Sequence, residues 1–208
     1  MFKKYHDKKK FLSVCVYCGS SSGNNPIYAD AAKALGRALV KQNLSLVYGG
    51  GHVGLMGIVA DAVLNAGGEV TGVIPKALMD TEVGHERLTR LLVVKDMHER
   101  KALMAEHADG FIAMPGGIGT LEELFETLTW AQLGFHEKPI GLLNVAGFYD
   151  PLIEFLRHQT SQGFLRIEHK DLLLVETEPD PLIEQLKNFT MPAGVSWLSR
   201  QRAQTLGP

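Results

Sequence analysis

The stretch GFIAMPGGIGTLEELFETL, residues 110–128, decides the fold class. Five small and apolar residues, 110–114, predict a buried strand, and a proline with three glycines then leads into a helix that we expect to begin near Thr120. A short strand that passes through a glycine loop directly into a helix is the repeating unit of a parallel α/β sheet. The stretch therefore predicts one such unit.

The same unit recurs along the rest of the chain. The expected strands are residues 12–18, 44–48, 69–74, 91–95, 110–114, 139–144 and 172–175, and the expected helices begin near Pro26, Gly54, Met97, Thr120, Tyr149 and Asp180. Asn25 before Pro26 is a favourable helix start, because asparagine caps a helix and proline presets its first backbone angle. Strands that are apolar on both sides must be covered on both sides. We therefore predict an α/β fold, a Rossmann-like, doubly wound parallel sheet with helices on both faces.

The predicted domain organisation is simple. Residues 11–190 form a single domain, preceded by a flexible basic tail at 1–10 and followed by a C-terminal tail at 191–208. The 208 residues, 45% of them hydrophobic, suffice for one core, and a net charge of −2 offers no positive field for nucleic acid. No apolar run reaches the ~20 residues that span a bilayer, and no signal-peptide core follows the basic start. We expect a cytoplasmic protein with neither a nucleic acid nor a membrane as partner.

The two cysteines, Cys15 and Cys18, have the C-x-x-C spacing of redox proteins and of some zinc sites. A redox pair opens a helix, whereas Cys15 lies in an expected strand. Residues i and i+3 of a strand face opposite sides. We therefore expect two ordinary buried thiols.

Three glycine-rich loops follow the first, second and fifth expected strands. They are CGSSSG at residues 18–23, YGGGHVGLMG at 48–57 and MPGGIGT at 114–120. The carboxyl ends of parallel strands lie at one edge of a sheet, so these loops can line one crevice. Glycine lets a backbone approach a ligand closely, and a helix N-terminus attracts anions. A tight turn explains any one of these loops, but loops this rich in glycine favour a phosphate site.

The common nucleotide motifs are incomplete in this sequence. Gly49, Gly51 and Gly54 match G-x-G-x-x-G, but the next strand ends in IPK, residues 74–76, where a dinucleotide site needs an acid for the ribose. A P-loop needs Gly-Lys-Ser or Gly-Lys-Thr, which residues 48–57 lack. An NAD-dependent oxidoreductase is therefore disfavoured.

Acidic residues stand directly behind the third loop. Thr120 and Glu123 have the spacing of a capping box, in which Thr120 caps the helix and Glu123 reaches back to its amide. A carboxylate there would also repel a bare anion bound by the loop. A sugar phosphate avoids this conflict, because its phosphate can take the amides while its hydroxyls take the carboxylate.

Charged residues also follow the fourth expected strand, in DMHERKALM at 96–104. Arg100 and Lys101 are candidates to neutralise phosphate or to polarise a leaving group. A solvated helix explains the same charges, and their spacing alone slightly favours that interpretation. His98 and Glu99 lack the second histidine of the zinc-protease motif, so we expect no metal site.

The motifs MHERKALM (97–104), PGGIGTLEE (115–123) and YGGGHVGLMG (48–57) closely resemble those of the LOG ("lonely guy") family, the cytokinin riboside 5′-monophosphate phosphoribohydrolases. The resemblance extends over residues 11–189, and the paired motifs R-K-x-x-M and P-G-G-x-G-T-x-x-E are far more specific than a lone glycine loop. It implies hydrolysis of the N-glycosidic bond of adenosine 5′-monophosphate, or of its N6-substituted form, to free base and ribose 5-phosphate. No cofactor is implied.

The resemblance also implies roles for individual residues. Arg100 and Glu123 match the catalytic pair: Glu123 would stabilise positive charge at the anomeric carbon or orient water, and Arg100 would stabilise the departing base or orient the substrate. The implied substrate-binding residues are Ser20, Gly50, Gly51, Gly54, Met97, Lys101, Gly116, Gly117, Gly119 and Thr120.

Two other functions stay open. A protein of the same fold can bind a nucleotide or a molybdenum cofactor without catalysis. The label lysine decarboxylase is often attached to this signature, but that activity needs pyridoxal phosphate on a lysine, and nothing around Lys76, Lys95 or Lys101 distinguishes one.

The helix after the third loop is apolar on more than one side. Its apolar residues are Leu121, Leu124, Phe125 and Leu128, with Trp130, Leu133 and Phe135 beyond them. A helix that is central to a thick core would explain them. The family resembled is commonly homodimeric, and we expect a homodimer.

Overall fold

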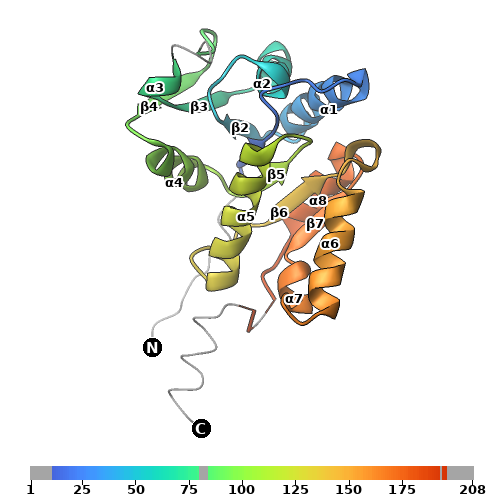
Figure 1. Cartoon of the computed structure of the whole chain (residues 1–208). Helices are drawn as coiled ribbons and strands as arrows, with labels where there is room; N and C mark the ends of the chain where they lie inside the picture. Colours follow the sequence, from blue (N-terminus) through green and yellow to red (C-terminus); the bar gives the residue numbers. More distant parts are fainter. Residues whose placement is uncertain (1–10, 80–83, 193, 196–208) are drawn as a thin grey trace, which may run out of the picture.

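The computed structural model describes residues 11–79, 84–192, 194 and 195 (Figure 1). Its centre is a seven-stranded sheet in the order β4-β3-β2-β1-β5-β6-β7, in which every neighbouring pair is parallel. The strands are β1 (Ser13–Tyr17), β2 (Ser45–Tyr48), β3 (Val70–Pro75), β4 (Arg90–Val94), β5 (Gly110–Ala113), β6 (Ile140–Leu143) and β7 (Leu173–Glu176). All seven expected strands are confirmed, with ends that differ by at most one residue. The strand order reverses between β1 and β5, which is where doubly wound sheets bind their ligands.

The helices connect consecutive strands, except for α8, which follows β7. They are α1 (Pro26–Lys41), α2 (Gly54–Asn65), α3 (Lys76–Met79), α4 (Met97–His107), α5 (Ile118–Leu133), α6 (Asp150–Ser161), α7 (Ile167–Lys170) and α8 (Pro179–Asn188), with a 3₁₀ turn at Val145–Gly147. The six expected helices are present. The short α3, α7 and the 3₁₀ turn were not expected, because three or four residues are too few to establish a helical period.

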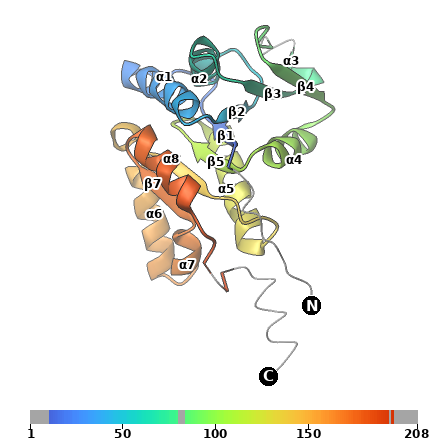
Figure 2. The same cartoon turned by 180° about the vertical axis from the view of Figure 1, so that it is seen from behind.

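The helices cover both faces of the sheet, as predicted. The helices α1, α2 and α8 lie on one face, and α4, α5 and α6 lie on the other (Figures 1 and 2). Each face has its own hydrophobic core. Cys18 belongs to the first core and Cys15 to the second, and both thiols are free and buried, which confirms the interpretation of the cysteine pair.

The helix starts follow local capping chemistry. The Asn25 side chain accepts a hydrogen bond from the amide of Ile27 (3.1 Å), as expected for a cap before Pro26. Asp96 caps α4 by accepting from the amide of Glu99 (2.9 Å). Since the residues preceding α4 fix its first turn, they also fix the direction in which its charged side chains leave the helix.

The predicted domain boundaries at residues 10 and 190 stay predictions, since residues 1–10 and most of 191–208 lie outside the described part of the chain. Val195 is buried in the second core, and its carbonyl oxygen lies 3.0 Å from the Nε2 atom of His169. Some of the chain beyond residue 190 thus packs on the domain. None of the helices in the described ranges has the length and apolar character that a membrane span requires.

Candidate active site

The three glycine loops meet at the carboxyl edge of the sheet. The Gly19 amide donates to the Pro115 carbonyl (3.1 Å), and the Leu55 amide donates to the Gly19 carbonyl (3.0 Å). A Cβ atom on Gly54 would lie 2.3 Å from the Ser20 carbonyl carbon, and one on Gly116 would lie 2.8 Å from the Gly19 nitrogen. Gly54 also has a φ of +58°, which disfavours other residues. Glycine is therefore needed where these loops touch.

The start of α5 differs from the predicted capping box. The helix begins at Ile118 with Gly117 as its N-cap, so Thr120 is inside the first turn rather than at the cap. The Thr120 side chain is buried against Gly116, and within the described residues no backbone amide donates to the Glu123 carboxylate. The prediction that Thr120 caps the helix is wrong, because Gly117 can adopt the extended cap conformation two residues after the proline. Glu123 is thereby free for another role.

The N-terminus of α5 is open to solvent. Gly117 and Gly119 are exposed, and a Cβ atom on either would meet nothing within 4 Å. The first amides of this 16-residue helix have no partner within the helix, and the helix dipole makes its N-terminus positive. This end of α5 can therefore bind an anion.

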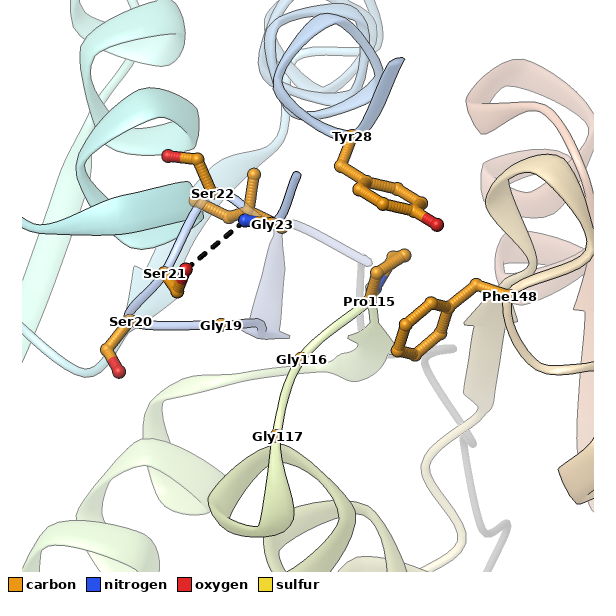
Figure 3. A pocket seen from close by; sticks show the side chains of 11 residues that line it. Gly19, Ser20, Ser21, Ser22, Gly23, Tyr28, Pro115, Gly116, Gly117 and Phe148 are labelled. Carbon is orange, nitrogen blue, oxygen red and sulfur yellow. Dashed lines mark hydrogen bonds between the residues drawn. The ribbon is translucent and has the colours of Figure 1, made fainter. Parts of the chain in front are cut away.

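A cavity of about 220 Å³ lies between the first and third loops (Figure 3). The rings of Tyr28 and Phe148 line it and approach each other edge to face, with centroids 5.7 Å apart. The rest of the lining is Gly19, Ser20, Ser21, Ser22, Gly23, Leu55, Pro115, Gly116 and Gly117. Pockets for small ligands usually measure ~300–1,000 Å³, so this cavity can hold only part of a nucleotide. Neither Arg100 nor Glu123 lines it.

Arg100 is not a solvated helix charge. Only 6% of it is exposed, and its Nη2 donates to the carbonyl of Gly49 (3.1 Å) at the end of β2. Its Nη1 lies 3.6 Å from the sulfur of Met97, and its Nε is buried without a partner among the described residues. Buried donors are normally paired, so an unpaired nitrogen on a buried guanidinium indicates a place for a ligand or a water.

Glu123 has an unusual acidity. Burial raises its pKa to about 7, while the Arg100 guanidinium opposes that rise and Glu122 adds to it. After burial, the charge of Glu123 is the next cause that raises the pKa of the Cys18 and Cys15 thiols. A carboxyl group that titrates near neutral pH beside a buried arginine is typical of catalytic sites. The structure thus brings Arg100 and Glu123 together from separate segments.

Lys101 faces a different way from Arg100. Its Nζ donates to Glu122 and, at 3.0 Å, to Glu126, both on α5. Its side chain is largely buried, and the hydrogen bonds to the two carboxylates raise its pKa against the effect of burial. The ammonium predicted to bind substrate is therefore already engaged in an ion pair that joins α4 to α5.

Gly50 and Gly51 lie away from the cavity. Gly50 has a φ of +80° and packs on Ile74, and Gly51 pairs with Gly84 in an isolated antiparallel bridge. The structure therefore places them beside β3, between the sheet and the segment that precedes β4.

Several residues at the site were missed by the sequence analysis. Gly49 was noted only as part of a dinucleotide motif, yet a Cβ on it would lie 1.9 Å from Nη2 of Arg100. Tyr28 and Phe148 were also missed. Both follow a strand end, which was the only signal in the sequence, but an aromatic residue at such a position is as often part of a hydrophobic core.

Comparison with known proteins identifies the family. A family model described as "possible lysine decarboxylase" matches residues 56–186. The probable cytokinin riboside 5′-monophosphate phosphoribohydrolase LOGL2 of Oryza sativa subsp. japonica is 51% identical over 183 residues, which are 88% of this chain and 75% of that protein. The chain belongs to the LOG family. The LOG family member LOG1 of Arabidopsis thaliana, a cytokinin riboside 5′-monophosphate phosphoribohydrolase, is 49% identical over 88% of this chain and 85% of its own length.

Solved structures outside the close LOG relatives share the fold. The molybdenum cofactor carrier protein of Chlamydomonas reinhardtii superposes with a TM-score of 0.63 at 19% identity, over 86% of this chain and 98% of its own. The molybdenum cofactor binding protein of Rippkaea orientalis gives 0.64 at 21% identity, over 88% and 98%. At this identity the similarity establishes the Rossmann-like fold alone, as predicted for the LOG-family chain.

Proposed function

We propose that this LOG-family chain hydrolyses the N-glycosidic bond of adenosine 5′-monophosphate, or of an N6-substituted cytokinin form, to free base and ribose 5-phosphate. The observation that carries the proposal is Glu123, a carboxyl with a pKa of about 7 beside the buried Arg100, on the helix whose N-terminus is open to an anion. The names of relatives that are about 50% identical support the same reaction.

The arrangement suits a sugar phosphate. The phosphate binds the free amides at the start of α5, around Gly117 and Gly119. Glu123 lies six residues further along, about 9 Å up the helix axis, and helical side chains lean back toward the N-terminus. The carboxyl therefore faces the region where the ribose of a phosphate-anchored nucleotide must lie.

The reaction replaces one bond with another. The bond between the anomeric carbon and the base nitrogen breaks with its electron pair on the base, a water oxygen bonds to that carbon, and the proton of that water ends on the base. The transition state has the positive sugar of glycoside hydrolysis, which a carboxylate stabilises. Glu123 in its ionised form supplies that charge and orients the water, and Arg100 interacts with the departing base through its unpaired Nε.

The test is direct turnover. Purified protein is incubated with adenosine 5′-monophosphate and, separately, with isopentenyladenosine 5′-monophosphate, and free base and ribose 5-phosphate are followed by chromatography. We expect release by the wild type and loss of release in a folded Glu123→Gln variant, whose amide has the shape of the protonated acid. Tight nucleotide binding without release would favour a non-catalytic nucleotide or molybdenum-cofactor binder. Carbon dioxide from lysine with pyridoxal phosphate would favour the decarboxylase.

The proposal includes a homodimer in the cytoplasm. Phe125 of α5 is 36% exposed, and Phe135, directly after this helix, is 67% exposed. Large apolar side chains that remain in water favour a protein partner. The free thiols of Cys15 and Cys18 suit a reducing compartment. Light scattering after gel filtration would give twice the mass of the chain, and Phe135→Glu would lower it if this face is the interface.

A further inference from the structure

A polar cluster that the proposed reaction does not use lies behind the second glycine loop. Asp61 of α2 receives three side chains: His52 at 3.3 Å between Nε2 and Oδ2, His85 at 3.2 Å between Nε2 and Oδ1, and the guanidinium of Arg87. His85 is only 2% exposed. His52 precedes α2, whereas His85 and Arg87 follow β3, so the cluster joins α2 to the chain on either side of β3.

The cluster has the residue types of a metal site, but its hydrogen bonds are those of a direct contact between two segments of the chain. The ligand atoms of His52, Asp61 and His85 lie within 4.8 Å of one another. However, Nδ1 of His85 accepts the backbone amide of Arg87 (3.3 Å), so the neutral ring carries its proton on Nε2 and donates it to Asp61. A metal-binding histidine instead donates from the nitrogen that does not face the metal. The contact between Asp61 and Arg87 already supplies a cation.

The segment held by the cluster in turn holds the glycine loop. The backbone amide of His85 donates to the carbonyl of Gly50 (3.2 Å), and Gly84 forms the bridge to Gly51. The next residue back, Gly49, accepts Nη2 of Arg100. A continuous set of contacts therefore runs from Asp61 through His85 and the loop to the arginine.

The loop needs such a restraint. Three consecutive glycines have more conformational freedom than any other tripeptide, and Gly50 is held at a φ of +80°. Arg100 has a second described contact only at the weakly accepting sulfur of Met97. Its direction is consequently set by where the Gly49 carbonyl lies.

We infer that the contact between His85 and Asp61 is a latch that positions Arg100 through residues 49–51, which makes His85 and Asp61 positioning residues for the reaction. The inference rests on the proposed function for the role of Arg100. The latch acts on the rate of bond breaking rather than on phosphate binding, since the phosphate binds at α5.

The test compares five full-length proteins. They are the wild type, His85→Ala, His85→Gln, Asp61→Asn and, as a matched control, Lys41→Ala, which removes an exposed 2.8 Å ion pair between α1 and Asp180 of α8. Asp61→Asn keeps the side-chain shape, so it protects the test against a His85→Ala protein that fails to fold. Each is measured for kcat and KM with the nucleotide that the wild type cleaves, and for amide hydrogen exchange in residues 48–54.

The expected result is specific. A misplacement of the order of 1 Å costs about 10²-fold in rate, so kcat falls toward that value in His85→Ala, by less in Asp61→Asn and not in Lys41→Ala, while KM changes little. Exchange in residues 48–54 becomes faster in the two latch variants only. His85→Gln, which keeps a donor for Asp61, recovers part of kcat.

Several results would overturn the inference. One is a His85→Ala protein with wild-type kcat and wild-type exchange, and another is an equal loss in Lys41→Ala, which would indicate general destabilisation. A wild-type rate that changes with Zn²⁺ or with a chelator would assign the cluster to a metal instead. If the wild type cleaves neither nucleotide, the proposed function fails, and the exchange data alone then decide whether the latch exists.

Discussion

The substitution Gly49→Ala tests whether activity depends on the position of the Arg100 guanidinium, apart from any loss of stability. The added Cβ would lie 1.9 Å from Nη2 of Arg100 and 3.1 Å from its Cζ. Ordinary contact begins near 3.4 Å, so the guanidinium must retreat by about 1.5 Å. Gly49 is not among the glycines with positive φ, so alanine fits the backbone there.

The expected loss of activity exceeds the expected loss of stability. A displacement of this size corresponds to a rate loss of about 10²-fold, which is about 2.7 kcal/mol of transition-state stabilisation. The lost bond from Arg100 to the Gly49 carbonyl costs about 1.5–3 kcal/mol, and the stiffer unfolded chain returns about 0.4–1 kcal/mol. The net change in unfolding free energy is therefore smaller than the change in activation free energy.

The assay is kcat with the better nucleotide, alongside urea unfolding. In the Arg100→Ala background the same substitution should cost no further activity, because the group that it displaces is gone. Wild-type kcat in Gly49→Ala would refute the argument. So would an additive loss in the double variant, since the alanine would then act on something other than Arg100.

Three further predictions concern the same site. The kcat/KM value should rise as pH increases through about 7, because burial raises the pKa of Glu123 and the reaction uses its ionised form. The substrate phosphate itself titrates near pH 6. The pH dependence of nucleotide binding to Glu123→Gln measures the contribution of the phosphate alone. Lys101→Met should lower the unfolding free energy by about 1 kcal/mol and lower kcat more than it raises KM, because Lys101 holds α5 rather than the substrate; a rise in KM alone would contradict this. Gly54→Ala should lower the unfolding free energy by about 1–3 kcal/mol in urea, since its Cβ would collide with the Ser20 backbone, and an unchanged midpoint would refute the close contact.

The sequence predicted the elements of the fold where a pattern repeats. It did not predict contacts of a side chain that has several possible hydrogen-bond partners. Apolar runs and glycine loops predicted every strand and the meeting of the loops, because burial on both faces and a common carboxyl edge follow from the parallel topology. The capping box failed at α5 because Gly117 competes for the cap position. Arg100 could not be told from a solvated charge, since the carbonyl that receives it is 51 residues away in the sequence.

The neighbours Arg100 and Lys101 show why α4 matters to the site. Arg100 contacts the end of β2, whereas Lys101 contacts α5, which carries Glu123. The helix α4 is thus connected both to the loop after β2, which orients Arg100, and to α5, which carries Glu123. Loss of either contact shifts Arg100 and Glu123 relative to each other but leaves no cavity in a hydrophobic core. We therefore expect such changes to reduce activity more than stability. The same reasoning makes the latch at His85 and Asp61 the outermost member of one connected arrangement that ends at Arg100.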